Sequence, residues 1–192
     1  CEGIDASSET IREIMKKEHE EKQLPYSRMV LMGFSQGGGL SLYTGLQLKP
    51  EQKLAGIVVM SSYLPAHKQF NMTPELRDTS ILHVHGENDN ADIAKISQEA
   101  VTELGATDYK LKTYPNLAHS VNMDELNDVI EYLKKVLPVD DMCRVTLKDP
   151  SKMSVKELKV AVRNAGLGSK AVIFAEKSEF VKLLQDHRDG KL

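Results

Sequence analysis

One short apolar run that stops at a serine between glycines constrains this chain more than any other feature. The run covers residues 28–32, and Gly33, Ser35 and Gly37 follow at alternate positions. Such a run is typical of a buried strand, and the stretch 40–48 is compatible with a helix. The sequence therefore predicts a strand, a tight turn and a helix, with Ser35 at the apex of the turn.

The spacing Gly33-x-Ser35-x-Gly37 matches the elbow that presents a nucleophilic serine at the end of a strand. We expect a side chain at either glycine to collide with the neighbouring strand or helix. The backbone N–H of Gln36, which opens the helix, is expected to point to the position of a developing oxyanion. Because ordinary turns also show this spacing, the hypothesis needs a carboxylate and a histidine further along the chain.

Composition places the chain among ordinary globular proteins. Its 192 residues suffice for one domain, or for one domain and a small appendage, with 41% hydrophobic and 28% charged residues. No apolar run approaches the ~20 residues that span a bilayer, and the polar N-terminus is unlike a signal peptide. The cysteines, Cys1 and Cys143, suggest no disulfide framework and favour a cytoplasmic location. A chain that begins with Cys1 is interpreted as a fragment or a processed product.

Helical and strand patterns alternate as far as residue 137. We expect helices over 8–21, 40–48, 92–104 and 123–137, and strands over 28–32, 54–60, 80–86 and 109–114. In the last helix the residues expected to face inward are Leu126, Val129, Ile130, Leu133 and Val136. The alternation predicts an α/β fold, a mostly parallel sheet with helices on both faces.

Three chemically apt side chains fall just past predicted strand ends: Ser35, Asp89 and His119. Because the carboxyl ends of parallel strands share one edge, the three are expected to meet there. A serine hydroxyl becomes a good nucleophile when an imidazole takes its proton and a carboxylate orients that imidazole. We therefore predict Ser35 as nucleophile, His119 as base and then acid, and Asp89 as the orienting carboxylate.

Other residues compete for two of these roles. The remaining histidines are His19, His67, His83, His85 and His187. His67 stays open as an alternative base, whereas His83 and His85 share one strand face, where a structural role is favoured because no third metal ligand accompanies them. Glu87 and Asp92 compete with Asp89, although Asp92 is well placed to cap the following helix. No metal site is expected.

A change of charge marks a second unit. Acidic residues prevail up to residue 142 and basic residues from Cys143 onward. We expect a domain over 1–138, a linker over 139–152 and a small all-α module over 153–192. The module begins with a capping box, Ser154-x-x-Glu157, before an apolar periodic helix that stops at Gly166, and Ser178 could cap a second helix.

Several separated motifs occur in one order. They are residues 33–44, 54–56 and 61–65, then His85-Gly86 with Asp89, then Thr113-Tyr114 with His119-Ser120. In this combination the segment 4–138 resembles the acyl-protein thioesterase/carboxylesterase family of α/β-hydrolases. The resemblance implies a cytosolic serine hydrolase, without cofactor or metal, that cleaves S-palmitoyl thioesters on proteins or related esters and lysophospholipids. It also implies a hydrophobic acyl channel, for which Leu64, Pro65 and Leu117 are the expected wall.

The chain departs from this family at two places. Asn90 follows Asp89 where the family usually has proline, which loosens the expected turn. The family's N-terminal strands and its His-Gly oxyanion loop are absent from these residues, so we expect a partial α/β-hydrolase fold. Because a second oxyanion donor is missing, this chain is expected to be a weak or inactive hydrolase, while its full-length parent is active.

The tail resembles SAP-like helical modules through residues 153–159 and 176–181. The resemblance and the positive charge of the tail allow a nucleic-acid partner, and spread rather than clustered charges allow a protein partner equally. An alternative to the enzyme is therefore an inactive hydrolase-like scaffold that binds a protein or nucleic acid through its basic tail.

Overall fold

The computed structural model describes residues 2–139, 149–172, 174–188 and 191. The chain divides into two compact units, Cys1–Asp141 and Met142–Leu192, each with its own core. Both cysteines and residues 140–148, the larger part of the predicted linker, lie outside the described residues. None of the described helices combines the length and hydrophobicity needed to cross a membrane.

The first unit alternates helices and strands, as the sequence predicts. Its elements are α1 (Glu2–Lys22), β1 (Val30–Phe34), α2 (Gln36–Gly45), β2 (Gly56–Met60), β3 (Ile81–Gly86), α3 (Ala91–Glu103), β4 (Tyr109–Tyr114) and α4 (Met123–Val136). The four strands form one parallel sheet in the order β1-β2-β3-β4, which confirms the predicted fold class. Because the strands are parallel and in sequence order, the loops that follow β1, β3 and β4 leave from the same edge of the sheet.

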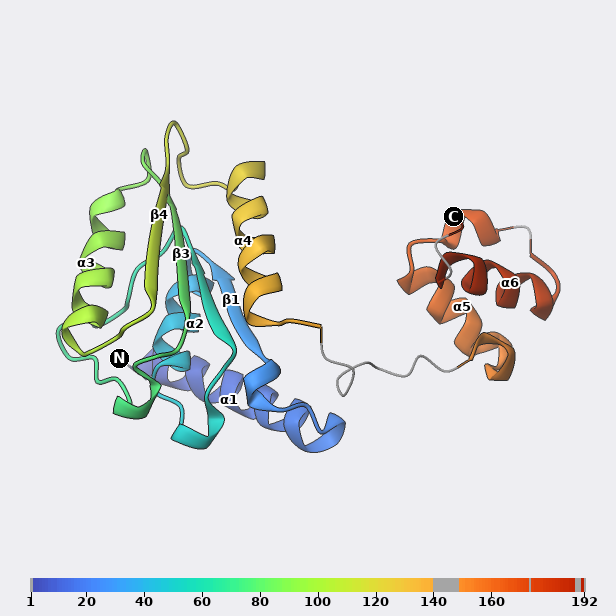
Figure 1. Ribbon diagram of the computed structural model, residues 1–192, viewed down its shortest axis with the longest axis horizontal. Coiled ribbons are helices and arrows are strands. Elements are labelled where there is room, and N and C mark those ends of the chain that lie inside the picture. Colours follow the sequence, from blue (N-terminus) through green and yellow to red (C-terminus); the bar gives the residue numbers. More distant parts are fainter. Residues whose placement is uncertain (1, 140–148, 173, 189–190, 192) are drawn as a thin grey trace. The chain divides into compact units, whose positions relative to one another are not determined.

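Helices lie on both faces of this sheet (Figure 1), and an apolar cluster packs on each face. Met15 of α1, Leu42 of α2 and Val101 of α3 share a cluster with Ile57 of the sheet. On the other face, Val129 of α4 packs in a second cluster, with Tyr132 and Leu133 against it. Helices thus cover both faces, as expected for a parallel sheet.

The predicted inward face of α4 is partly wrong. Val129 is buried, but Leu126 is 38% exposed and Ile130 is 47% exposed. Glu125, which the apolar pattern assigned to solvent, is fully buried instead. The helix is therefore rotated so that its 125/129/133 stripe faces the sheet, positions that share one face at helical spacing.

Strand β1 is an edge of the described sheet. Met32 is 53% exposed and Phe34 is 39% exposed, although both belong to an apolar strand. Their backbones pair on one side only, with Val58 and Met60 of β2. An uncovered apolar edge of this kind is a place where a further strand can add to a sheet.

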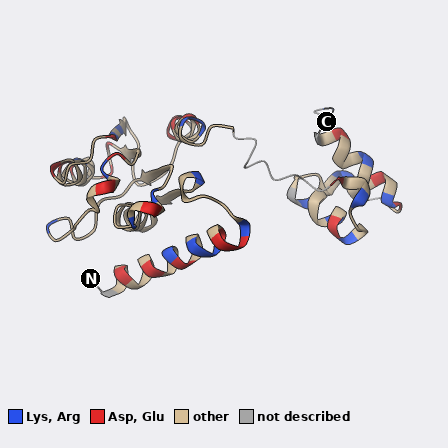
Figure 2. Ribbon diagram, turned by 60° about the horizontal axis from the view of Figure 1, so that its bottom comes forward, with Lys and Arg blue, Asp and Glu red and all other residues tan. Residues whose placement is uncertain are grey.

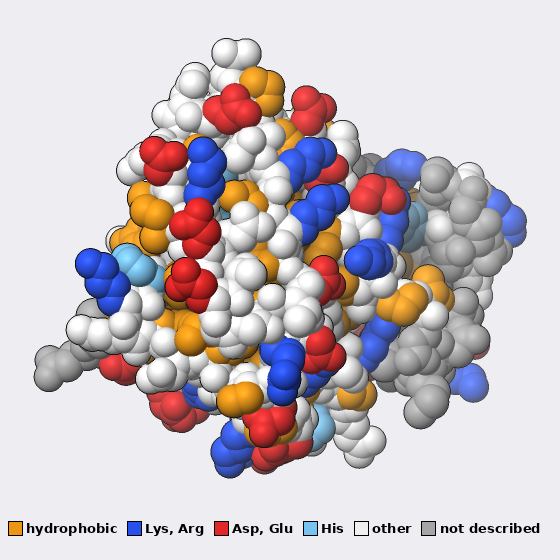
Figure 3. Space-filling model, turned by 60° about the vertical axis from the view of Figure 1, so that its left-hand side comes forward, with side chains coloured by type: hydrophobic (Ala, Val, Ile, Leu, Met, Phe, Trp, Pro, Cys, Tyr) orange, Lys and Arg blue, Asp and Glu red, His pale blue; other side chains and the backbone are white. Residues whose placement is uncertain are grey.

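Surface charges of the first unit are mixed in sign. Along α1 acidic and basic side chains alternate (Figure 2), and ion pairs join Lys16 to Glu20 and Lys22 to Glu18. Red and blue side chains are also interspersed on the face seen in Figure 3. Exposed pairs of this kind contribute little to stability, typically ~0–1 kcal/mol each, so the apolar clusters dominate the folding of this unit.

The second unit is a small helical module. Its described residues contain the short 3-10 helices η5 (Pro150–Lys152) and η6 (Gly168–Ala171) and the helices α5 (Val155–Asn164) and α6 (Lys177–Arg188). Leu158 of α5 and Leu184 of α6 meet in its core. The predicted capping box is present, because Ser154 N donates to Glu157 Oε2 at 2.6 Å and Glu157 N donates to Ser154 Oγ at 3.3 Å.

Candidate active site

Ser35 occupies the turn between β1 and α2. Its backbone is in a rarely populated region, with φ 54° and ψ −126°, and its N–H donates to Met60 O on β2 at 2.9 Å. Its carbonyl accepts from Gly38 N and Gly39 N, at 2.9 and 3.3 Å, and so starts the helix. A strained residue persists only where its surroundings hold it, and strain of this kind clusters at functional sites.

The flanking glycines are not equivalent. A Cβ on Gly33 would lie 2.1 Å from the backbone carbon of Gly37, so no side chain fits there. A Cβ on Gly37 meets nothing within 4 Å, and the expectation of a collision at Gly37 is wrong. The close approach to the loop after β2 occurs at the next two residues of α2. A Cβ on Gly38 would lie 2.8 Å from Ser62 Cβ, and a Cβ on Gly39 would lie 2.8 Å from Tyr63 O.

The structure brings Ser35, Asp89 and His119 together at this edge of the sheet. His119 Nε2 lies 3.0 Å from Ser35 Oγ, and His119 Nδ1 lies 2.7 Å from Asp89 Oδ2. Because an ionised carboxylate only accepts hydrogen bonds, the Nδ1 of His119 carries a proton and donates it. The Nε2 lone pair then remains to accept from the hydroxyl of Ser35, which is the arrangement that a nucleophilic serine needs.

Backbone hydrogen bonds hold the two loops that carry the acid and the histidine. Glu87 N donates to Tyr114 O and Asn88 N donates to Leu117 O, each at 2.9 Å. Gly86 permits this contact, because a Cβ there would lie 2.3 Å from Leu117 O. The loop after β3 and the loop after β4 therefore form one joined surface beside Ser35.

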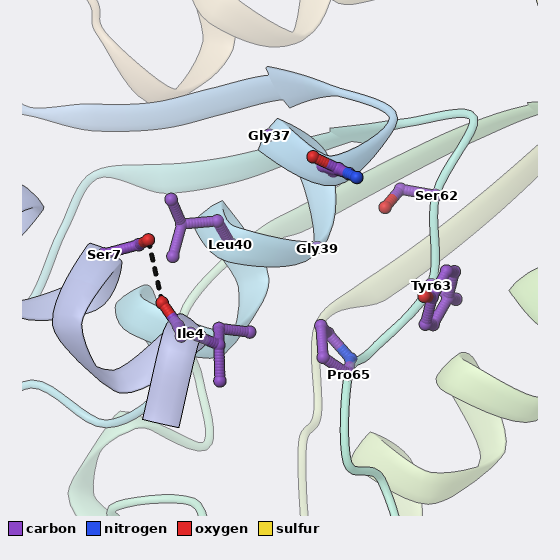
Figure 4. Close-up of a pocket in the computed structure, with 10 residues that line it drawn as sticks. Ile4, Ser7, Gly37, Gly39, Leu40, Ser62, Tyr63 and Pro65 are labelled. Atoms are coloured by element: carbon purple, nitrogen blue, oxygen red, sulfur yellow. Dashed lines mark hydrogen bonds between the residues drawn. The ribbon is translucent and has the colours of Figure 1, made fainter. Parts of the chain in front are cut away.

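A pocket of 430 Å³ lies at the start of α2 and is lined in part by Gln36, the residue after Ser35 (Figure 4). Its lining comes from α1, from the start of α2 and from the loop after β2: Gly3, Ile4, Ser7, Gln36, Gly37, Gly39, Leu40, Ser62, Tyr63 and Pro65. Gln36 is the first residue of α2, where backbone N–H groups have no partner within the helix. The pocket thus joins an apolar wall to a helix N-terminus, a place that favours a negative charge.

Of the three residues predicted to form an acyl channel, Pro65 lines this pocket. Leu64 is 1% exposed and packs in the cluster beneath α2, and Leu117 is 7% exposed and packs in the cluster beneath α4. Both leucines are therefore core residues in this structure.

Comparison with known proteins supports the family resemblance that the sequence motifs indicate. Residues 1–137 match the model of the phospholipase/carboxylesterase family. The chain belongs to this family.

Its curated relatives include fungal thioesterases. The chain is 38% identical over 132 residues to acyl-protein thioesterase 1 of Aspergillus fumigatus, covering 65% of this chain and 54% of the relative. It is 38% identical over 144 residues to acyl-protein thioesterase 1 of Gibberella zeae, covering 71% and 60% respectively. The chain therefore spans little more than half the length of these relatives.

Solved structures show the same fold. SOBER1 of Arabidopsis thaliana superposes with a TM-score of 0.61 at 29% identity, covering 70% of this chain and 64% of that protein. Acyl-protein thioesterase 2 of Zea mays superposes with a TM-score of 0.60 at 22% identity, covering 71% and 65%. The second likeness is one of fold alone.

The departure at Asn90 has a structural explanation. Asn90 precedes α3 with φ 41° and ψ 59°, in the left-handed region. Proline, with φ fixed near −65°, does not fit that conformation, whereas asparagine tolerates it better than most residues. The turn in this chain therefore differs from a proline turn, and Asp89 still reaches His119.

The competing residues lie elsewhere. His67 is exposed on the loop after β2, and it is His119 that contacts Ser35. Glu87 is exposed and accepts from Thr113 Oγ1 at 3.0 Å. Asp92 was predicted to cap the helix, but the N-cap is Asn90, and Asp92 pairs instead with Lys95 at 3.4 Å.

One residue beside the site escaped the sequence reasoning. The ring of Phe34 lies 4.9 Å from the imidazole of His119, centroid to centroid, with the planes at 42°. Its position directly before Ser35 was the available signal, but the predicted strand ended at residue 32 and Phe34 was given no role. Within the described ranges, no group of three or more His, Cys, Asp or Glu side chains could hold a metal ion.

Proposed function

We propose that this chain is a serine hydrolase of acyl esters and thioesters that works through Ser35, His119 and Asp89. The supporting observation is the unbroken relay of contacts, 3.0 Å from Ser35 Oγ to His119 Nε2 and 2.7 Å from His119 Nδ1 to Asp89 Oδ2. Residues 84 positions apart in the chain meet in one hydrogen-bonded line. That geometry fits nucleophilic catalysis.

In the proposed reaction, Ser35 Oγ attacks the acyl carbonyl carbon while His119 Nε2 takes the hydroxyl proton. Asp89 keeps the imidazole in its Nδ1–H tautomer and stabilises the imidazolium. When the tetrahedral intermediate collapses, His119 returns the proton to the leaving thiol or alcohol, which leaves an acyl-serine. Water then attacks the acyl-serine with His119 again as base, and the carboxylic acid and free Ser35 are released.

The carbonyl oxygen becomes negative in each tetrahedral intermediate. The backbone N–H of Gln36 at the start of α2 is the proposed donor to this oxyanion. The acyl chain is assigned to the neighbouring pocket, whose 430 Å³ is in the range of small-molecule sites. Pro65, Tyr63 and Ile4 would provide its apolar wall.

The substrate class follows from the relatives. Fungal acyl-protein thioesterases match the chain over 132 to 144 residues, so S-acylated proteins are the proposed substrates, with lipid and simple carboxylic esters as related ones. A cytoplasmic location fits such substrates. No cofactor takes part in the proposed reaction.

Replacing the nucleophile tests this proposal. Ser35→Ala should lower kcat for hydrolysis of acyl thioesters and p-nitrophenyl esters by ~10⁶, as expected for a triad nucleophile. Ser41→Ala is the matched control, because Ser41 lies in the same helix and donates only to Gly37 O at 2.8 Å. Equal hydrolysis by the Ser35→Ala protein and the unmodified chain would contradict the proposal. A series of acyl chain lengths, as thioesters and as oxyesters, would then define the preferred substrate.

A further inference from the structure

A second histidine contacts the acid of the site from inside the sheet. His85, on β3, is fully buried, and its Nε2 lies 2.5 Å from the backbone O of Asp89 and 3.6 Å from Asp89 Oδ2. Because a carbonyl oxygen only accepts, the Nε2 of His85 carries a proton and donates it. The imidazole of His85 therefore holds the backbone of Asp89, the residue whose carboxylate faces His119.

The other hydrogen bonds that hold the turn of Asp89 come from the backbone N–H groups of residues 87–89. Glu87 N donates to Tyr114 O at the end of β4, Asn88 N donates to Leu117 O in the loop after β4, and Asp89 N donates to Gly86 O at 3.1 Å. The chain then reverses through the left-handed Asn90 into α3. The bond from His85 is thus the contact that ties the carbonyl end of Asp89 back to the sheet.

A second histidine packs beside His85. His83 is also fully buried on the same face of β3, its ring centroid is 5.6 Å from that of His85, and the planes meet at 70°. His83 Nδ1 bonds to Tyr109 Oη at 2.7 Å, and burial together with the nearby His85 lowers the pKa of His83 to about 3. The hydrogen bond of His83 therefore goes to β4, whereas that of His85 goes to the turn at Asp89.

Burying His85 has an energetic cost that packing alone does not explain. In the described part of the chain its Nδ1 has no hydrogen-bond partner. A buried unpaired polar atom destabilises the folded state, and Val or Leu at this position would avoid that loss. The neighbouring strand positions, Leu82 and Val84, are apolar as expected of a buried strand.

From these contacts we infer that His85 is a positioning residue, whose Nε2–H fixes the turn at Asp89 so that the carboxylate stays aligned with His119. The inference rests on the proposed function for its catalytic meaning, but the contact itself is testable without catalysis. His85 touches no substrate in this account and acts only through Asp89.

The first test uses the unmodified chain. Nitrogen-15 NMR of the histidine rings should show His85 as the neutral Nε2–H tautomer, with a slowly exchanging proton. It should also show a downfield Nδ1–H signal from His119 bonded to Asp89. A His85 ring that carries its proton on Nδ1 would overturn the inference, whether or not any variant folds.

The second test compares three variants by the same His119 signal and by the rate at which a fluorophosphonate labels Ser35. His85→Leu should lose the signal and label about 10²-fold more slowly, the scale of a 1 Å misplacement. His85→Gln keeps an N–H donor and should keep the signal and most of the rate. His83→Leu is the matched control, from the same strand face and burial, and should lower stability but keep both readouts.

The outcomes separate the two proposals. If His83→Leu and His85→Leu change the His119 signal and the labelling rate equally, or if His85→Gln behaves like His85→Leu, the positioning role is wrong. If His85→Leu removes the signal but Ser35→Ala leaves hydrolysis intact, the contact is real and the proposed function is wrong.

Discussion

At the scale of single residues, the site depends on a few close approaches of backbone. Gly33 lets the start of α2 fold back onto β1, because its missing Cβ would lie 2.1 Å from Gly37 C. Gly86 lets the histidine loop reach the acid loop, because a Cβ there would lie 2.3 Å from Leu117 O. Ser35 itself accepts a strained backbone between these contacts.

Gly33 and Gly37, which flank Ser35, allow the effect of an added methyl group to be compared at two positions of one motif. Gly33→Ala should destabilise the first unit by about 1–3 kcal/mol or more, since the new methyl meets backbone that cannot yield easily. Gly37→Ala should cause no loss, because the added Cβ meets nothing within 4 Å and alanine favours the helix. Urea denaturation of both variants measures the difference. Equal midpoints would show that the motif glycines are not a steric requirement.

Sequence patterns predicted that Ser35, Asp89 and His119 meet at one edge of the sheet because each lies just past a strand, and the structure has them in contact there. Their catalytic roles stay a prediction. The patterns did not predict the contacts of Phe34 with His119 or of His85 with Asp89. The first contact joins a strand residue to a loop far along the chain, and the second joins a strand residue to the turn that follows the same strand. Strand periodicity records only which face a residue occupies, and so it could not show these pairings.

At the scale of elements, α4 shows where pattern reasoning reaches its limit. The helix and its bounds were expected, but Leu126 and Ile130 are exposed while Glu125 is fully buried. An apolar pattern marks the residues that avoid water, and it does not say which part of the protein covers them. In the described chain, the sheet covers the side of α4 that carries Glu125, Val129 and Leu133, and it leaves Leu126 and Ile130 exposed.

Glu125 provides a pH-dependent test of this arrangement. Neither carboxylate oxygen has a hydrogen-bond partner among the described residues, and burial raises the pKa of Glu125 above its usual value. A raised native pKa means that stability is fully present below the unfolded pKa of ~4.3 and is lost as the pH rises through the native pKa. Unfolding free energy should therefore fall with rising pH in that window, by up to about 1.4 kcal/mol per pH unit.

Glu125→Gln should remove this slope and leave the protein more stable than the unmodified chain above the window. Glu131→Gln on the same helix is the control, because Glu131 is exposed and pairs only with Lys134. Urea denaturation from pH 4 to pH 8 measures both. If the Glu125→Gln and unmodified proteins keep parallel pH profiles, the carboxyl group of Glu125 is not buried as described.

At the scale of the whole molecule, the chain combines an α/β unit with a small helical unit. The matches of the chain cover 54% and 60% of the two fungal relatives, and edge strand β1 of the first unit exposes Met32 and Phe34. The side chain of His119 is 50% exposed, so the proposed relay faces water more openly than an enclosed site does. The likeness of the helical unit to SAP-like modules stays a prediction from its sequence.

These features predict slow chemistry. Gln36 N–H is the one oxyanion donor proposed within these 192 residues, whereas the family resemblance implies two, and the loss of one donor typically costs about 10²–10³ in kcat. Under matched conditions, fluorophosphonate should therefore label this chain about 10²–10³-fold more slowly than it labels the Aspergillus fumigatus thioesterase. Equal labelling rates would show that the second donor is not needed.

The relay from Asp89 through His119 to Ser35 is the central claim, and its most direct test is to map the labelled residue. After reaction with a fluorophosphonate, mass spectrometry of the digested chain should find one adduct, on Ser35. His119→Ala should slow its formation by several orders of magnitude, as expected when the base of a triad is removed. An adduct on another residue, or an unchanged rate in the His119→Ala protein, would contradict the account.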